Sequence, residues 1–371
     1  MKVCCLNNYP LGKMSALADA GRVPRQHTWG IDALAARGHR VVLAPFHEPF
    51  EGHPLDRVST VLRHELGQLD QELHALTRTG VHVVYCAEQQ SARGLAVLPR
   101  RLRRAAVLVS LVHHPLSPGA RNRSVLGGHD LLIALSDRLR DDLLRDHALP
   151  AERVIVAAWG PDLSSPLYQP TGAGPVVSAG KSNRDLPTLV AALAEVGAPA
   201  VVYDLAGQIT DAPENVRVVR SGGPGADPVS RNGGYLMEAV MNDIRAANAV
   251  AIPISDPCRL TGLTELNDAL ALAKPIIMTR SPYTPIDIES VGCGLLVDPG
   301  DVRGWILARE RVTSDPSFAA ELGRRGRAYA EAHVNYGAFG DRLVDSVERV
   351  LDERGELRSE ALGPEAARVL A

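Results

Sequence analysis

The chain has 371 residues, more than one usual domain, so its length predicts two domains of roughly equal size. It is 45% hydrophobic and 22% charged with a formal net charge of -3, which excludes a broad basic surface for nucleic acid. Its five cysteines show no CxxC spacing, so we expect reduced core thiols. Neither a signal-peptide segment nor a window long enough to cross a bilayer occurs, and we therefore expect a cytoplasmic protein.

Six short apolar runs alternate with segments of helical length and period in the first part of the chain. They are KVCCL, RVVLAP, VHVVYCA, AAVLVSLV, DLLIALS and VIVAAW. This alternation is typical of a parallel sheet covered by helices. The alternation stops at residues 159–175, where Pro, Gly and Ser accumulate and indicate a linker.

A second alternation follows the linker. Its six strand-like runs are PVVSAG, AVVYDLA, NVRVVRS, AVAIPI, PIIMT and GLLVDPG, and only helical patterns follow Gly300. We therefore predict an α/β protein with two Rossmann-like parallel-sheet domains, residues 1–165 and 173–332, facing a central cleft. Such sheets bind ligands outside the carboxyl ends of their strands, so functional residues are expected in the loops that follow strands.

The loop after the first run of the second half carries two cations. The run ends at Gly180, and Lys181 and Arg184 precede a helix start marked by Asp185 and Pro187. Lysine is scarce: only four occur among 40 basic residues. Two cations beside free helix N–H groups predict a phosphate site, and ordinary surface charge is the alternative.

The stretch RLTGLTELNDALALAKPI, residues 259–276, begins a helix after the run AVAIPI. Thr261, Gly262, Leu263 and Thr264 would offer backbone amides to an anion. Glu265 and Asp268 are three residues apart and share one helix face. Taken alone, they are explained as carboxylates favoured by the helix dipole.

Two further segments could meet a substrate. His113 and His114 follow a strand, but without a third ligand at metal-binding spacing they do not predict a metal site. A long irregular loop, from about Asn7 to Pro24, follows the first strand and precedes a helix that is expected to start near Arg25. Its Gly12, together with the helix-start residues Arg25, Gln26 and His27, is a candidate acceptor site.

Several motifs are absent. No GxGxxG follows the first strand, which disfavours a dinucleotide-dependent oxidoreductase. GxxxxGK[ST] and GxSxG are missing, which disfavours P-loop enzymes and hydrolases with a nucleophile elbow. No convincing DxD follows a strand, so metal-assisted chemistry has no evident site.

With these pieces in place, the chain resembles retaining nucleotide-sugar glycosyltransferases of the GT-B fold, in particular glycosyltransferase family 4. Four stretches carry the resemblance in the family's order: DLLIALSDRLRDDLL with AERVIVAAWGPDLSSPLYQP, AGKSNRDLPTLVAAL, TGLTELNDALALAKPIIMT, and PIDIESVGCGLLVDPGD. Two departures occur. The family's two glutamates separated by seven residues become Leu260 and Asp268, and Ala273 replaces a usual glycine.

The resemblance implies a donor half and an acceptor half. Lys181 and Arg184 would contact the donor diphosphate, Asp268 the ribose, and His113 or His114 the transferred sugar. Gly180 and the segment Thr261–Glu265 would complete the donor site, and Ala206, Gly207 and residues 219–223 would lie around the base. The first domain would bind the acceptor, and a last helix, residues 336–353, would cross back onto it.

The implied activity is a retaining, metal-independent transfer that needs no cofactor. The sugar would pass from a nucleotide diphosphate donor to a hydroxyl, or another nucleophile, of a small-molecule or oligosaccharide acceptor. A nucleotide-sugar epimerase or hydrolase of similar fold, and a non-catalytic sugar-nucleotide binding partner, remain alternatives. A solute-binding protein is disfavoured because no export signal is present. The residues do not identify the base, the sugar, the acceptor or the oligomeric state.

Overall fold

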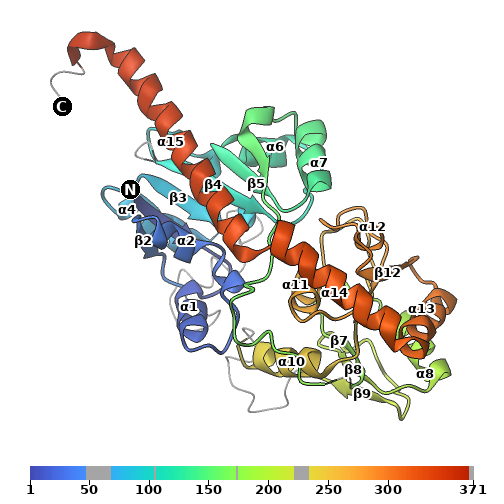
Figure 1. The fold of residues 1–371 in the computed structure, drawn as a ribbon. Coiled ribbons are helices and arrows are strands. Elements are labelled where there is room, and N and C mark those ends of the chain that lie inside the picture. Colours follow the sequence, from blue (N-terminus) through green and yellow to red (C-terminus); the bar gives the residue numbers. More distant parts are fainter. Residues whose placement is uncertain (47–67, 104–105, 173, 221–233, 367–371) are drawn as a thin grey trace. The chain divides into compact units, whose positions relative to one another are not determined.

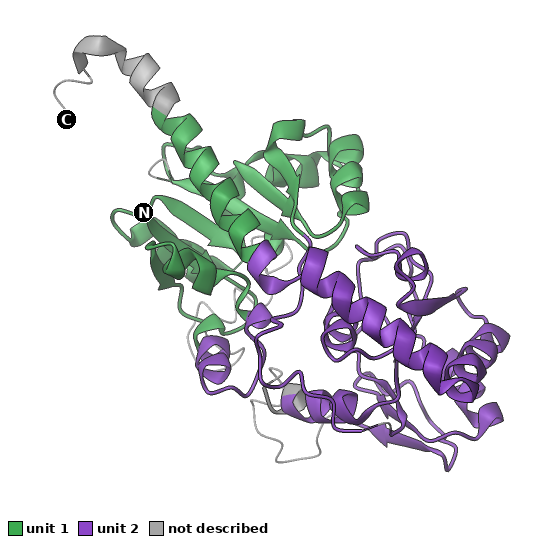
Figure 2. Cartoon of the chain, viewed as in Figure 1, with its two compact units in different colours: residues 1–12, 28–157, 339–371 green, residues 13–27, 158–338 purple. Residues whose placement is uncertain are grey.

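The structure is a computed structural model that describes residues 1–46, 68–103, 106–172, 174–220 and 234–366 (Figure 1). The chain divides into two compact units (Figure 2). Unit 1 comprises Met1–Gly12, Thr28–Ala157 and Phe339–Ala371, and unit 2 comprises Lys13–His27 and Ala158–Ala338. The segment Lys13–His27 therefore groups with the second unit, although its place in the sequence assigns it to the first.

Unit 1 is built on a parallel sheet of six strands in the order β2-β1-β3-β4-β5-β6. The strands are β1 (Lys2–Leu6), β2 (Arg40–Leu43), β3 (Val83–Cys86), β4 (Val107–Val112), β5 (Leu131–Ala134) and β6 (Val154–Val156). Each lies within a run that the sequence predicts as a strand. The order of the strands reverses between β1 and β3, where Leu6 is paired with Cys86, and this edge is the expected ligand position of such a sheet.

The strands β3 and β4 of unit 1 are buried along their whole length, as the continuous apolar runs predict for a parallel sheet with both faces covered. The helical segments of this unit are α2 (Ile31–Ala36), α4 (Leu69–Thr77), η2 (Gln89–Ala92), α5 (Arg93–Val97), α6 (Ala120–Gly127), α7 (Asp137–His147), η3 (Ala151–Arg153) and α15 (Tyr336–Ala366) from Phe339 onward. The side chains of Leu343 and Phe339 on α15 lie against Gly30.

Unit 2 carries a second parallel sheet of six strands, in the order β12-β11-β10-β7-β8-β9. Its strands are β7 (Val176–Ser178), β8 (Ala200–Tyr203), β9 (Val216–Val219), β10 (Ala249–Ile252), β11 (Ile276–Thr279) and β12 (Gly294–Val297). The order reverses between β7 and β10, so the loops after these two strands are the expected ligand position. All twelve predicted strands are confirmed, and the α/β class of the fold with them.

The remaining helical segments are α1 (Leu11–Asp19), η1 (Arg25–Thr28), α8 (Leu186–Val196), α10 (Gly234–Ala246), α11 (Leu263–Ala271), α12 (Ile288–Val291), α13 (Val302–Ser314) and α14 (Pro316–His333). The expectation of an irregular loop up to Arg25 was wrong, because α1 occupies part of it. Leu11, Met14 and Ala18 recur at helical spacing and are all buried, which explains this helix.

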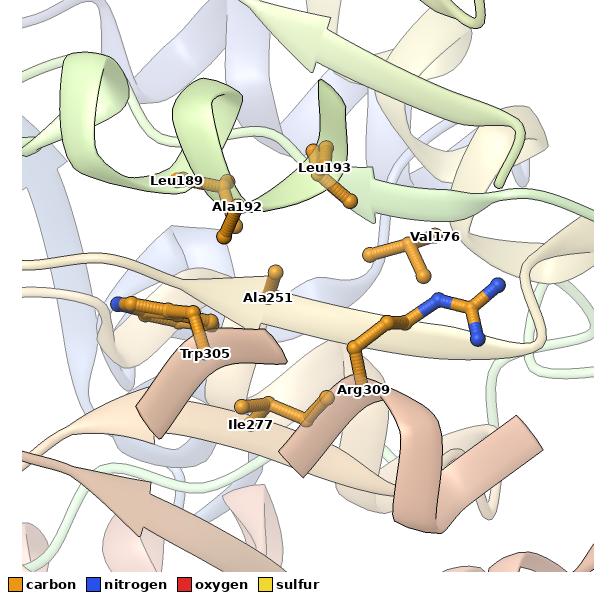
Figure 3. A pocket seen from close by; sticks show the side chains of 8 residues that line it. All are labelled: Val176, Leu189, Ala192, Leu193, Ala251, Ile277, Trp305 and Arg309. Atoms are coloured by element: carbon orange, nitrogen blue, oxygen red, sulfur yellow. The ribbon is translucent and has the colours of Figure 1, made fainter. Parts of the chain in front are cut away.

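The sheet of unit 2 has an apolar core on each face. Between α8, α13 and the sheet lies a small cavity, to which Arg309 contributes the one charged side chain of its lining (Figure 3). The side chain of Arg309 is buried, and burial lowers its pKa. Across the described residues, no helix is both long enough and apolar enough to span a bilayer.

Candidate functional site

The candidate site of unit 2 is built on the loop between β7 and α8. Asp185 caps α8 by accepting a hydrogen bond from the backbone N–H of Thr188, and Pro187 lies in the first turn of the helix. Asn183 adopts a left-handed backbone conformation, with φ of 54°, which Asn tolerates better than most residues. This conformation turns its side chain toward the loop that follows β10.

Asn183 ties the two loops of the switch point together. Its Oδ1 accepts hydrogen bonds from Ser255 Oγ (2.7 Å) and from the backbone N–H of Asp256 (2.9 Å). Its Nδ2 donates to the carbonyl of Asp256 (2.9 Å) and to Thr261 Oγ1 (3.2 Å). The loops after β7 and β10 therefore form one hydrogen-bonded platform directly before α11.

Arg184 and Glu265 form a buried ion pair on this platform. The guanidinium Nη2 donates to both carboxylate oxygens at 2.8 Å, and Nε donates to Oε1 at 3.2 Å. The Nη1 group donates to the carbonyl of Ser182. A side chain at Gly180 would overlap the guanidinium, so the glycine is required by this close approach. The charge of Arg184 is thus neutralised by Glu265.

Lys181 differs from Arg184 in its environment. Its side chain is exposed, and among the described residues it has no hydrogen-bond or ion-pair partner. The surrounding protein nevertheless withdraws enough water from the ammonium group to lower its pKa. Lys181 is therefore the cation of this loop whose charge is available to a ligand.

The helix α11 begins at a glycine. Gly262 is its N-cap and adopts φ of 84°, and a Cβ atom there would lie 2.6 Å from Ile252 Cγ2. The neighbouring Thr261 does not cap the helix; its Oγ1 accepts a hydrogen bond from Asn183 Nδ2 instead. The backbone N–H groups of the first turn, at Leu263, Thr264 and Glu265, have no carbonyl of a preceding helical turn as their acceptor. They form an electropositive helix start next to the platform.

Asp268 is almost completely buried one turn further along α11. Its Oδ1 accepts a hydrogen bond of 2.8 Å from the hydroxyl of Tyr168, which in turn accepts one from Nε2 of Gln26. Burial raises the pKa of Asp268 to about 7, the neighbouring charge of Glu265 adds to this rise, and the Tyr168 hydrogen bond partly offsets it. Burial also holds the pKa of Tyr168 well above its ordinary value, so the phenol stays a donor.

The segment before α2 is held by the linker of unit 2. Gln26 is fully buried; its Oε1 accepts from the backbone N–H of Asp162 (2.8 Å), and its carbonyl accepts from Trp159 Nε1 (2.9 Å). The backbone N–H of Arg25 donates to Asp162 Oδ2. His27 is buried with its ring edge against Trp159, and burial, together with the charge of Lys181, lowers its pKa to about 3. His27 is therefore neutral at physiological pH.

The two candidate histidines lie in unit 1. His113 Nε2 lies 2.7 Å from the carbonyl of Ala87, which can only accept, so Nε2 carries the proton. Burial lowers the pKa of His113 to about 4, and its ring meets Trp29 edge-on with centroids 4.6 Å apart. The neighbouring His114 is exposed.

The remaining predicted residues are spread over both units. Gly12 is exposed at the start of α1, and Gly207 is exposed with φ of 71° in the loop after β8. Of the segment expected around the base, residues 221–223 lie outside the described residues. The structure brings Gly180, Lys181, Arg184, Glu265 and the start of α11 together, while Gly12, His113 and His114 belong to unit 1.

Sequence reasoning missed Asn183, Tyr168 and Asp162 as organising residues of this site. For Asn183, the pattern KSNRD directly before a helix is a usable signal, because Asn is enriched where a residue must adopt a left-handed conformation. For Tyr168, no signal exists in the sequence, because its partners are distant along the chain: Gln26 lies 142 residues before it and Asp268 lies 100 residues after it. Within the described residues, no group of three or more His, Cys, Asp or Glu could hold a metal ion.

Comparisons with known proteins agree with this architecture. No protein-family model matches the chain. The D-inositol 3-phosphate glycosyltransferase of Rhodococcus opacus (strain B4) is 25% identical over 253 residues, and that of Rhodococcus jostii (strain RHA1) is 26% identical over the same length. These matches cover 62% of this chain and 56% and 55% of the relatives, so the chain spans about half the length of the curated relatives it matches.

Solved structures match over nearly the whole chain. Sucrose-phosphate synthase from Thermosynechococcus elongatus has a TM-score of 0.69 and 16% identity, covering 95% of this chain and 100% of that chain. The Anabaena protein Alr3699/HepE in complex with UDP-glucose has a TM-score of 0.62 and 14% identity, covering 94% and 100%. The chain therefore has the GT-B fold, and in sequence and structure it resembles glycosyltransferases of that fold similar to family 4.

Proposed function

We propose that the chain is a retaining, metal-independent glycosyltransferase that moves a sugar from a nucleoside diphosphate donor to an acceptor nucleophile. The acceptor would be a hydroxyl, or another nucleophilic group, of a small molecule or an oligosaccharide. The observation that carries this proposal is the exposed ammonium of Lys181 at the switch point of unit 2, next to the N-terminus of α11. A cation and free helix amides at this position suit a diphosphate.

Transfer of the sugar requires stabilisation of the departing nucleoside diphosphate. Lys181 and the N–H groups of Leu263, Thr264 and Glu265 would supply it, because they are fixed before the negative charge develops. Arg184 would act indirectly, since its charge is balanced by Glu265 and its hydrogen bonds hold the loop. In a retaining transfer of this kind, the acceptor attacks from the face of the leaving group and a diphosphate oxygen takes its proton.

Two features of the matched proteins support the assignment of the donor. The Anabaena protein was solved with UDP and with UDP-glucose, and the curated relatives are named as glycosyltransferases.

The charges of the described part of unit 2 also favour a diphosphate at Lys181. His27 is neutral and the charge of Arg184 is balanced by Glu265, so the positive charge of Lys181 remains available near the start of α8. On the acceptor side, unit 1 would bind the acceptor, and the exposed His114 would contact the transferred sugar.

The first test is calorimetric titration of the metal-free protein with UDP, GDP, dTDP and ADP. We expect one nucleotide to bind selectively, and Lys181→Ala to weaken its binding by about tenfold to a hundredfold, since hydrogen bonds to charged groups contribute about 1.5–3 kcal/mol. Lys13→Ala is the matched control, because Lys13 is an exposed lysine of the same unit. Equal binding by all three proteins, or no binding at all, would contradict the proposed donor site.

A second measurement separates transfer from its alternatives. With the matching nucleotide-sugar, NMR would show whether a glycoside forms and whether its anomeric configuration is that of the donor. Activity that persists in EDTA supports metal independence. Release of free sugar or an epimerised donor identifies a hydrolase or an epimerase, and binding without turnover identifies a non-catalytic partner.

A further inference from the structure

Asn183 is bonded through both its backbone and its side chain to the segment that follows β10. Its carbonyl accepts from the backbone N–H of Ser255 (3.3 Å), and its Oδ1 accepts from Ser255 Oγ (2.7 Å) and from the N–H of Asp256 (2.9 Å). Its Nδ2 donates to the carbonyl of Asp256 (2.9 Å) and to Thr261 Oγ1 (3.2 Å). Within the described part of the chain, this one residue therefore makes five hydrogen bonds to the segment that leads into α11.

The side chain of Asn183 is used to its full capacity. An amide has two N–H donors and an oxygen with two lone pairs, and each of them has a partner in the protein. An aspartate would keep the acceptor oxygen but lose both donor bonds. The backbone is left-handed, with φ of 54°, and asparagine is enriched in this conformation. Asparagine thus meets the conformational and the hydrogen-bonding demands of the position together.

Asn183 lies between the two groups that would bind phosphate in the proposed function. Lys181 is two residues before it in the same loop, and Thr261 directly precedes Gly262, the N-cap of α11. The ammonium of Lys181 and the first-turn amides of α11 therefore belong to different loops. The hydrogen bonds of Asn183 hold those two loops together.

A fixed spacing between these two groups matters for a ligand with two phosphates. A single phosphate can be bound by either group alone, whereas a diphosphate has to meet both at once. Ordering two loops during binding would cost free energy, and a spacing that is set before binding avoids that cost. The hydrogen bonds of Asn183 should therefore strengthen the binding of a nucleoside diphosphate more than that of the corresponding monophosphate.

We infer that Asn183 is a positioning residue that fixes the spacing between Lys181 and the start of α11 and thereby selects nucleoside diphosphates over monophosphates. The inference rests on the proposed function for the class of ligand. Asn183 acts through its neighbours, because its side-chain donors and acceptor are taken up by the protein. The ion pair of Arg184 with Glu265 also joins the loop to α11, so loss of the Asn183 side chain should leave the fold intact.

The experiment compares the full-length wild type with Asn183→Gly and Thr261→Val. Glycine adopts φ of 54° without strain, so the first variant keeps the backbone and removes only the side-chain hydrogen bonds. The second removes one acceptor, Thr261 Oγ1, with little change in shape. Asn215→Ala is the matched control. Asn215 Nδ2 also donates to two carbonyls, those of Leu193 (2.9 Å) and Ala198 (2.8 Å), but it precedes β9 and so lies at the opposite edge of the sheet.

Calorimetry would measure binding of UDP, GDP, dTDP and ADP and of the four corresponding monophosphates, and thermal unfolding would measure Tm. We expect the wild type to bind one diphosphate at least about tenfold more tightly than its monophosphate. Asn183→Gly should bind that diphosphate about tenfold more weakly, with binding of the monophosphate unchanged. Thr261→Val should show a smaller loss in the same direction. Asn215→Ala should lower Tm and leave both affinities unchanged.

The double variant Lys181→Ala/Asn183→Gly tests whether Asn183 acts through Lys181. We expect it to bind the diphosphate within about twofold of Lys181→Ala alone, because the spacing has no function once the ammonium is removed. Three results would each overturn the inference: additive losses in the double variant, equal losses for the two phosphates, or an unchanged preference in Asn183→Gly or, where that variant does not fold, in Thr261→Val. Failure of the proposed function would look different, because the wild type would then bind no nucleotide.

Discussion

The hydroxyl of Tyr168 donates a hydrogen bond to Oδ1 of Asp268 over 2.8 Å, and both groups are buried. This contact joins the linker of unit 2 to α11, and Gln26 extends it to the segment before α2. The resemblance to family 4 implies a ribose contact for Asp268, and that role stays a prediction. In the structure, its observed partner is a neutral phenol.

Asp268→Asn should reveal the cost of ionising Asp268. Its pKa is raised from 3.8 to about 7, so the folded state holds a proton that the unfolded state releases, and this contribution to stability falls as pH rises from about 4 to about 7. At 1.36 kcal/mol for each pH unit, the loss is at most about 4 kcal/mol. The variant lacks this loss. Its free energy of unfolding minus that of the wild type, measured with urea, should therefore be larger at about pH 8 than at about pH 5. A pH-independent difference between the two proteins would contradict the expectation.

Glu265→Gln should destabilise the protein by about 3–5 kcal/mol, because it leaves the buried guanidinium of Arg184 without its counter-charge. Arg280→Ala breaks an exposed pair with Asp298 in the same unit and should cost less than about 1 kcal/mol. The comparison uses urea unfolding at neutral pH. The double variant Arg184→Leu/Glu265→Leu removes both charges and should recover most of the stability, because the loss in Glu265→Gln comes from the unpaired charge of Arg184. The ion pair would then position the loop rather than stabilise the fold. A double variant as unstable as Glu265→Gln would contradict this explanation.

The two histidines of unit 1 should respond differently to substitution. His114→Ala is expected to lower the rate of sugar transfer while leaving Tm nearly unchanged, because the side chain is exposed. His113→Ala should lower Tm, since it removes the hydrogen bond to Ala87 and the contact with Trp29. Thermal unfolding and transfer assays on both variants test this. A normal rate for His114→Ala would exclude it as the residue that contacts the sugar.

Ala273→Gly should stabilise the protein by about 1 kcal/mol. Ala273 follows α11 with φ of 52°, a conformation that costs an L-residue about that much and costs glycine nothing. Ala148→Gly is a matched test in unit 1, because Ala148 follows α7 with φ of 51°. Ala269→Gly, inside α11, should change stability in the opposite direction. Equal effects of the three substitutions on the free energy of unfolding would contradict this explanation.

Much of the fold follows from local patterns. Buried parallel strands need continuous apolar residues, so all twelve appear as apolar runs, and the break at Trp159 lies close to the division between the units at Ala157. The helix α1 was missed because the polar and glycine residues between its three buried side chains hide the periodicity. The grouping of Lys13–His27 with unit 2 depends on Gln26 and Asp162, whose contacts are not encoded locally.

By itself, the sequence determined the α/β class, the two sheets, and the loop in which Lys181 lies. Secondary structure depends on neighbours a few residues apart, and ligand positions follow from the strand order. Only the tertiary structure decided that Glu265 neutralises Arg184 and that Tyr168 binds Asp268. The charge and hydrogen-bonding capacity available to a ligand depend on which side chains meet across the fold, and no spacing along the chain encodes those encounters.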